Sequence, residues 1–196
     1  IEKVLVNLPR RGEDFKAGTP ANDLPADYDP RKASKDPALS VEIPAELDLA
    51  KIKRREVATP VYLVKEGGKV SLYVLPVYGK GLWSTLYGFV ALEADLRTVR
   101  GITFYEHGET PGLGGEIENE RWKALWPGKV AISEAGEPQI DVVKGRVEAG
   151  TPDAERKVDG LSGATITSNG VEGLVNYWLG PDAFGPYLEQ QRQTIR

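Results

Sequence analysis

Small and hydroxyl-bearing residues are concentrated in Asp159-Gly160-Leu161-Ser162-Gly163-Ala164-Thr165-Ile166-Thr167-Ser168. Apolar residues then recur at i, i+3, i+4 and i+7, the spacing of one buried helical face: Val171, Leu174, Val175 and Trp178. The stretch therefore predicts a turn that opens a helix, with Ser162, Thr165 or Thr167 close to the helix start. Free backbone N–H groups and the positive end of the helix dipole favour an anion at such a place.

A simpler interpretation of this stretch is helix capping. Ser162 or Asp159 could accept a hydrogen bond from the first free N–H groups, which is worth about 1 kcal/mol. The glycines weaken this interpretation, because Gly163 lies in the turn and Gly170 and Gly173 lie inside the helix. A helical glycine costs up to about 1 kcal/mol relative to alanine and is often tolerated where something packs against the backbone.

Composition predicts one globular domain that binds no nucleic acid. The chain has 196 residues, is 40% hydrophobic, and carries 25 basic against 29 acidic residues, a net charge of −4. The absence of cysteine excludes disulfides, thiolate metal sites, iron–sulfur clusters and cysteine nucleophiles. No apolar run is long enough to span a bilayer. Because the chain starts at Ile1 and contains no methionine, we expect any signal or membrane anchor to precede it.

The pattern of strands and helices predicts an α+β fold. Residues 1–50 are polar and proline-rich, so an extended arm is expected there and a domain over residues 51–196; the basic run 51–55 is expected to be a solvated flank. Two hairpins should form an antiparallel sheet, residues 60–66 with 69–77 around Gly67-Gly68, and residues 87–94 with 99–106. Helices are expected to pack against this sheet.

The remaining expected elements follow the second hairpin. A short helix is predicted from Glu116 to Trp126, one or two strands around residues 139–147, and a final helix over residues 182–196. This last helix should pack through Phe184, Tyr187 and Leu188.

Two glycine-containing loops flank the predicted hairpins. Residues 79–85 carry Trp83, for which packing in the core is favoured over stacking on a planar ligand. Residues 107–115 combine His107, Glu109, a Thr110-Pro111-Gly112 turn and further glycines, a composition compatible with a ligand-binding loop or a plain turn.

The sequence offers few catalytic arrangements. His107 is the only histidine, which excludes a zinc site with several histidine ligands, and no G-x-S-x-G elbow accompanies it. A hydrogen-bonding spacer is the favoured role for His107. The phosphate-binding loop of NTPases and the G-x-G-x-x-G dinucleotide fingerprint are absent as well. We therefore predict no catalytic side chain and no metal ligand.

Several motifs resemble a known family. The run Asp159-x-x-Ser162-Gly163-Ala164-Thr165 resembles the D-x-x-(S/T)-G-A-T motif of the covalently flavinylated FMN-binding domain family. Three further segments resemble one branch of this family, the C subunits of sodium-translocating NADH:quinone oxidoreductases. These segments are residues 79–84, 107–114 and 178–180. The resemblance extends from about residue 31 to the C-terminus, and the family's N-terminal membrane helix has no counterpart here.

The resemblance implies a cofactor and its attachment. FMN would be esterified through its phosphate to Thr165, whose β-branched side chain directs the flavin more firmly than serine would. Ser162, Gly163 and Ala164 would approach the phosphate. Trp83 and Leu113 are the candidates for an apolar slot around the flavin ring, and Glu109 and Thr110 are the candidate polar contacts. A carboxylate near the ring would lower the reduction potential of the flavin.

The resemblance also implies partners and a location. The flavin would relay electrons within a membrane complex that couples NADH oxidation by quinone to sodium export. A separate flavin transferase would attach the FMN, and Asp159 would be part of what it recognises or a local cap. The domain would lie on the periplasmic face of the inner membrane, anchored through the N-terminal helix that this chain lacks.

Two alternatives remain open from the sequence. The related Rnf ferredoxin:NAD oxidoreductase complex contains a flavin subunit with the same flavinylation motif. A non-redox module that binds an anion or a flavin noncovalently at the same helix start is the alternative from another class.

Overall fold

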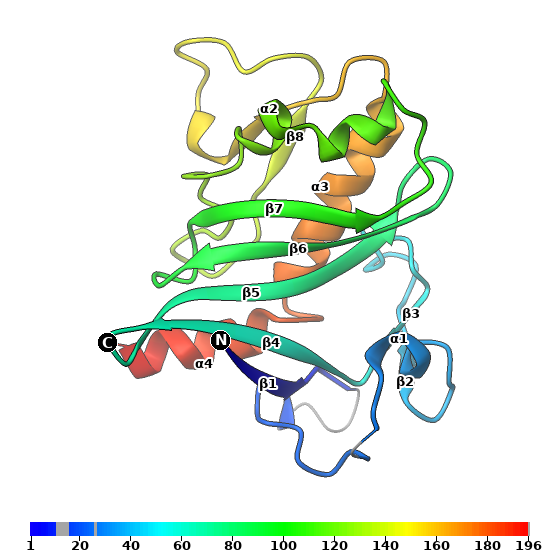
Figure 1. Ribbon diagram of the computed structural model, residues 1–196, viewed down its shortest axis with the longest axis vertical. Coiled ribbons are helices and arrows are strands. Elements are labelled where there is room, and N and C mark those ends of the chain that lie inside the picture. Colours follow the sequence, from blue (N-terminus) through cyan, green and yellow to red (C-terminus); the bar gives the residue numbers. More distant parts are fainter. Residues whose placement is uncertain (11–15, 26, 196) are drawn as a thin grey trace.

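The computed structural model describes residues 1–10, 16–25 and 27–195. An antiparallel five-stranded sheet with the order β1-β4-β5-β6-β7 forms its centre (Figure 1). The strands are β1 (Glu2–Asn7), β4 (Ala58–Glu66), β5 (Lys69–Lys80), β6 (Thr85–Glu93) and β7 (Val99–Glu106). The predicted α+β class and its antiparallel sheet are confirmed.

Both predicted hairpins form. Strands β4 and β5 meet at the pair Glu66–Lys69, and Gly67 and Gly68 between them adopt φ angles of +57° and +80°. Two successive positive φ angles are what a tight primed turn requires, so the Gly-Gly signal identified this turn correctly. Strands β6 and β7 form the second hairpin, in which Leu96 of the connecting link is fully buried.

Strand β1 was not predicted from the sequence. Residues 2–7 pair antiparallel with β4, and Val6 and Leu8 are 0% and 1% exposed in the main core. The arm expected over residues 1–50 thus contributes a sheet strand, while the division of the chain at residue 50 remains a prediction.

Helix α3 (Thr165–Leu179) crosses one face of the sheet and packs on β5 (Figure 1). The four apolar residues of its predicted face, Val171, Leu174, Val175 and Trp178, are all 0% exposed. The indole N–H of Trp178 donates to the carbonyl of Tyr78 at 2.7 Å, which ties the helix to β5. The predicted helix and its buried face are both confirmed.

The C-terminal helix α4 (Gly185–Ile195) packs against the segment that follows β1, where the side chain of Gln190 donates to the carbonyl of Ala17 at 2.8 Å. Figure 1 shows this helix in red. It starts three residues later than expected. Its predicted anchors, Phe184, Tyr187 and Leu188, are buried as expected.

The chain between β7 and α3 departs most from expectation. The helix predicted over residues 116–126 is divided into a 3-10 helix (Gly114–Glu118) and α2 (Glu120–Lys123). Asn119 separates them, because its backbone is extended and its side chain accepts from the N–H of Arg121. Strand β8 (Asp141–Val143) is close to the predicted position, but it pairs parallel with an unpredicted strand, β9 (Lys157–Asp159).

The remaining elements are short. They are α1 (Pro30–Ala33), the antiparallel pair β2 (Ser40–Glu42) and β3 (Arg54–Glu56), and a 3-10 helix (Ala154–Arg156). The basic run 51–55 is not uniformly solvated, because Arg55 is 3% exposed. Its guanidinium donates to the carbonyls of Pro9 and Asp182, so it joins the N-terminal arm to the segment between α3 and α4.

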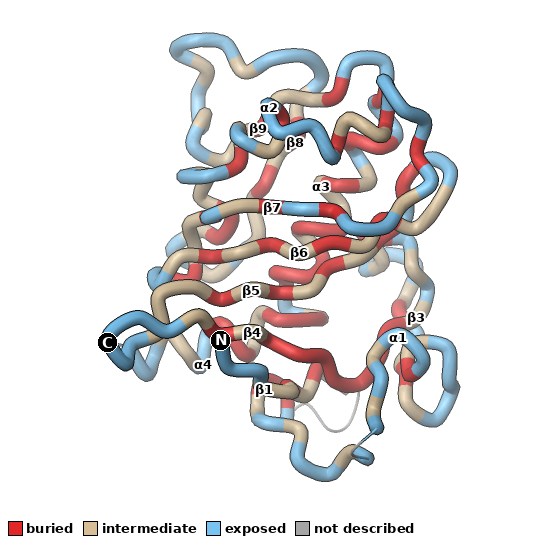
Figure 2. The backbone as a smooth tube through the Cα atoms, viewed as in Figure 1, coloured by how far each residue is buried: buried red, intermediate tan, exposed pale blue. Residues whose placement is uncertain are grey.

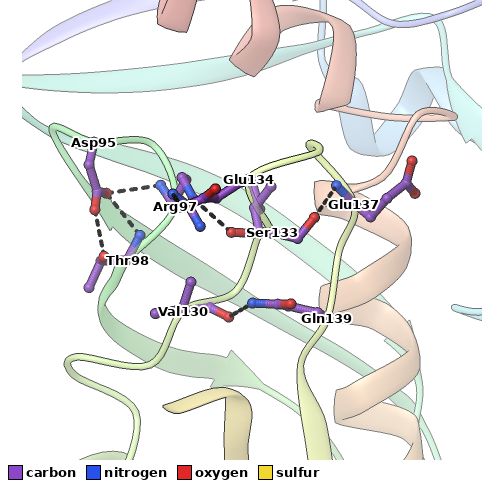
Figure 3. A network of polar contacts seen from close by, with 9 residues as sticks. Asp95, Arg97, Thr98, Val130, Ser133, Glu134, Glu137 and Gln139 are labelled. Carbon is purple, nitrogen blue, oxygen red and sulfur yellow. Dashed lines mark hydrogen bonds and ion pairs between the residues drawn. The ribbon is translucent and has the colours of Figure 1, made fainter. Parts of the chain in front are cut away.

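A polar network connects the β6–β7 turn with residues 130–139 (Figure 3). Asp95 accepts from the backbone of Arg97 and Thr98, and the Arg97 guanidinium donates to the carbonyl of Ile132 at 2.9 Å. Gln139 donates to the carbonyl of Val130 in the same network. These bonds hold residues 130–139 against the sheet.

Burial alternates along the central strands (Figure 2). Along β6, buried residues alternate with half-buried residues over the whole strand. None of the helices in the described ranges is long and apolar enough to cross a membrane.

Candidate functional site

The start of α3 lacks a side-chain cap. Ala164 occupies the cap position with φ −132° and ψ 50°, and no side chain bonds to the first-turn N–H groups. The capping interpretation is therefore wrong for both of its candidates. Ser162 is exposed, and the Asp159 carboxylate accepts instead from the N–H of Val147 at 2.9 Å.

Thr165 is the first residue of α3 and is exposed. It borders a pocket of about 390 Å³ between the helix start and the segment that follows β8. The pocket is lined by Val142, Val143, Lys144, Gly145, Arg146, Gly160, Leu161, Ser162, Gly163, Thr165, Ser168 and Asn169. This volume lies in the range of small-molecule sites, roughly 300–1,000 Å³.

Two cationic residues of this pocket were not predicted from the sequence as site residues. Lys144 and Arg146 are exposed, and neither makes an ion pair within the ranges that the structure describes. They precede Thr165 itself by 21 and 19 residues and belong to no recognisable pattern, so only the fold brings them to the helix start. A helix N-terminus together with two unpaired cations gives the pocket a positive potential.

The turn before α3 depends on two of its glycines. Gly163 has a φ angle of +71°, which a residue with a side chain rarely adopts. A Cβ on Gly160 would lie 2.3 Å from the carbonyl oxygen of Val143, so this glycine allows the turn to approach β8. Ser168 completes the turn, because its hydroxyl accepts from the N–H of Leu161 at 2.9 Å.

The helical glycines do permit close approach, as their positions suggested. A Cβ on Gly170 would lie 2.4 Å from the carbonyl oxygen of Lys80, and one on Gly173 would lie 2.3 Å from that of Leu49. What approaches α3 at these glycines is therefore the chain's own backbone.

Trp83 does not pack in the core. Its side chain lies on the loop between β5 and β6 and is 65% exposed, so the favoured interpretation from sequence is wrong. The surrounding backbone is held by polar contacts instead. The carbonyl of Trp83 accepts from Lys80 Nζ at 3.1 Å, and the N–H of Gly81 donates to the carbonyl of Ser84 at 2.8 Å.

Glu109 is 5% exposed and points into the protein. Its Oε1 accepts from the N–H groups of Trp83 (2.9 Å) and Ser84 (3.2 Å), and its Oε2 accepts from the N–H of Leu82 (3.1 Å) and the hydroxyl of Thr167 (2.6 Å). Burial opposes ionisation, but these four hydrogen bonds outweigh it and lower the pKa of Glu109. The carboxylate expected to contact the flavin ring thus binds the Trp83 loop and α3.

Leu113 lies beside the turn that precedes α3. It is 45% exposed, and its Cδ2 would be 3.1 Å from a Cβ on Gly163. Thr110 is exposed, and its carbonyl accepts from the N–H groups of Leu113 and Gly115. The structure thus brings Leu113 and, through Glu109, the Trp83 loop to the first turns of α3.

His107 belongs to the same loop and contributes to its shape. Its Nδ1 accepts from the N–H of Glu109 at 3.1 Å, which fits the predicted spacer role. No cluster of acidic and histidine side chains suited to a metal ion occurs in the described part of the chain.

This chain matches known proteins at two levels, a domain family and a narrower family of reductase subunits. The model of the FMN-binding domain family matches residues 81–180, from the Trp83 loop to the end of α3. The particular family follows from individual relatives. The C subunit of the Na(+)-translocating NADH-quinone reductase of Pseudomonas aeruginosa is 53% identical over 92% of this chain and 69% of its own length. The corresponding protein of Vibrio anguillarum is 53% identical over 91% of this chain and 69% of its own.

A solved structure agrees with these relatives. NqrC of Shewanella oneidensis superimposes with a TM-score of 0.85 at 36% identity, covering 98% of this chain and 84% of the other. The chain therefore belongs to the family of C subunits of the Na(+)-translocating NADH-quinone reductase, the family that its motifs resembled.

Proposed function

We propose that this chain carries FMN as a phosphoester on Thr165 and relays electrons within a sodium-translocating NADH:quinone oxidoreductase. The observation that carries the proposal is the setting of Thr165. It is an exposed hydroxyl on an uncapped helix start, at the edge of a pocket that also contains Lys144 and Arg146.

The donor set of the pocket fits a phosphodiester. The first-turn N–H groups of α3 lack a side-chain acceptor, and the helix dipole adds a partial positive charge. Lys144 and Arg146 supply two further charges on the facing segment. A phosphodiester needs such neutralisation, whereas a neutral ligand would gain little from it.

The flavin ring requires an apolar surface beside the attachment point. Trp83 and Leu113 offer exposed apolar side chains on loops held to α3 and to the turn before it. Bound FMN supplies reversible electron transfer, and the residues of this chain orient the ring, shield it from water and balance the phosphate charge.

Attachment requires a separate flavin transferase. A threonine hydroxyl is a weak nucleophile unless a base activates it. No side chain in the described ranges forms a hydrogen bond to the Thr165 hydroxyl, and Asp159 is engaged with Val147. We propose that Asp159 serves the transferase by holding the turn and the basic segment in the shape that the transferase binds.

The assignment of partners rests on the names of the relatives, and the assignment of location rests on the resemblance of the motifs to the family. We propose that the domain works with the other subunits of the reductase, on the periplasmic face of the inner membrane, through a membrane helix outside this chain. The Rnf alternative is less favoured, because the relatives described above are named as components of an NADH-quinone reductase.

The attachment is tested by denaturing protein that has been co-expressed with its transferase. Wild type and Ser162→Ala, the variant that removes the other exposed hydroxyl of the motif, should retain the flavin after denaturation. Thr165→Ala should lose it. Flavin that washes off the wild type, or Thr165→Ala protein that stays yellow, would instead support the noncovalent alternative.

A further inference from the structure

We propose that Glu109 is a positioning residue that fixes the Trp83 loop relative to the helix carrying Thr165. The inference rests on the proposed function, since it assigns Trp83 to the flavin slot. It differs from a direct flavin contact, because Glu109 acts here through the backbone of residues 82–84.

The hydrogen bonds of Glu109 connect three separate segments. Its carboxylate accepts from three consecutive backbone N–H groups of the loop after β5 and from the Thr167 hydroxyl on α3. Glu109 itself belongs to the loop after β7. A single side chain thus joins both glycine-containing loops to the helix that begins with Thr165.

The acceptor capacity of this carboxylate is filled within the chain. A carboxylate offers about four acceptor positions, and each Glu109 oxygen already accepts two hydrogen bonds. A ligand would have to displace one of these donors to reach it. The arrangement therefore suits a fixed internal anchor.

Two glycines make room for the carboxylate. A Cβ on Gly81 would lie 2.7 Å from Glu109 Oε1, and a Cβ on Gly114 would lie 2.8 Å from Oε2 and 2.5 Å from Thr167 Oγ1. The glycines of the two loops thus allow the backbone to close around Glu109.

The hydrogen bonds of Glu109 determine the position of Trp83. Its indole is 65% exposed, while its own N–H and those of both neighbours are held by one buried anion. Packing therefore does not hold the ring, and its position follows from the backbone beneath it. Without the carboxylate, this loop would lose the bonds that tie it to α3.

Amide hydrogen exchange tests the anchor in the flavin-free chain. Glu109→Gln keeps the size of the side chain but turns an NH₂ group toward the loop donors. Exchange at residues 82–84 should accelerate by roughly tenfold or more, the effect expected from losing charge-assisted hydrogen bonds. Glu120→Gln, which removes a charge from an 87% exposed side chain, should leave exchange unchanged. Protection at residues 82–84 within twofold of wild type would overturn the proposal.

Flavin spectroscopy tests the consequence for the site. In flavinylated protein that remains folded, Glu109→Gln should raise flavin fluorescence and reduce visible circular dichroism, because Trp83 no longer stacks in a fixed position. Thr167→Val removes one donor and should shift the same signals, whereas Thr167→Ser should restore them. Wild-type spectra in both Glu109→Gln and Thr167→Val would contradict the positioning role.

The two measurements separate this inference from the proposed function. Failure of FMN attachment in wild type would overturn the proposed function. The exchange experiment uses the flavin-free chain, so it would still test the role of Glu109.

Discussion

Thr165 and Thr167 lie two residues apart on α3 but have opposite surroundings. Thr165 is exposed beside the basic pocket, whereas Thr167 is 0% exposed and its hydroxyl donates to Glu109. Ser168 is also buried and bonded within the turn. Of the four hydroxyl-bearing residues from Ser162 to Ser168, therefore, only Ser162 and Thr165 are exposed. Under the proposed function, this difference in exposure would let a transferase distinguish Thr165 from Thr167.

Removing the pocket cations should slow flavin attachment. We expect Lys144→Ala/Arg146→Ala to reduce the rate by about tenfold, because each charge contributes roughly 0.5–1 kcal/mol at an exposed site. Covalently bound flavin, followed over time with purified transferase, measures the effect. The matched control is Lys3→Ala/Lys69→Ala, which removes two exposed charges from β1 and β5. Equal rates in the two double variants would contradict the role of the pocket cations.

Glu109 should make stability depend on pH. Its pKa is lowered in the folded protein, so its stabilisation is complete above the usual carboxyl range and is lost as the pH falls through the folded pKa. At pH 7 we expect Glu109→Gln to reduce the free energy of unfolding by about 1–3 kcal/mol. Urea unfolding of both proteins between pH 7 and pH 3 should show this difference shrinking toward acid. A difference that grows toward acid would refute the assigned sign.

Individual residue roles were only partly predictable. The sequence predicted Thr165 close to a helix start, where the structure places it, but the burial of Glu109 and the exposure of Trp83 depend on how two loops meet α3. Lys144 and Arg146 carried no local signal, because their proximity to Thr165 results from the β8–β9 pairing.

At the scale of elements, α3 contacts other backbone segments through its glycines. A Cβ at Gly170 would lie 2.4 Å from the carbonyl oxygen of Lys80, the last residue of β5. Gly170→Ala should therefore destabilise the fold by about 1–3 kcal/mol despite alanine's higher helix propensity. Asn169→Ala, at an exposed neighbouring position, is the control. Urea unfolding provides the comparison, and a stabilised Gly170→Ala protein would show that the close contact is absent.

The elements differed in how much the sequence revealed about them. The hairpins and α3 have long, regular apolar patterns, and a Gly-Gly turn marks the first hairpin. Strands β8 and β9 have three residues each and pair across a distance in sequence, so neither periodicity nor turn chemistry identifies them. The helix expected over residues 116–126 was divided at Asn119, whose capping preference competed with the apolar spacing.

At the scale of the whole molecule, the N-terminal segment is part of the core. Val6 is fully buried on β1, so Val6→Ala should lower the free energy of unfolding by about 2 kcal/mol through loss of packing. Lys3→Ala, at an exposed position of the same strand, should have little effect. Thermal unfolding of both variants measures this, and equal midpoints would show that β1 is not integrated into the fold.

The antiparallel sheet could be predicted from the sequence because four of its strands, β4 to β7, form two consecutive hairpins. The fifth strand was not, since six residues of β1 must find β4 across some fifty residues of chain. Proline-rich composition suggested an arm but did not indicate that part of it pairs with the sheet.

Covalent attachment of FMN to Thr165 is the central claim, and the intact mass of chain co-expressed with its flavin transferase tests it most directly. We predict an increase equal to one FMN less one water, which peptide mapping assigns to Thr165. An unmodified mass with active transferase present, or the same increase assigned to another residue, would contradict the claim.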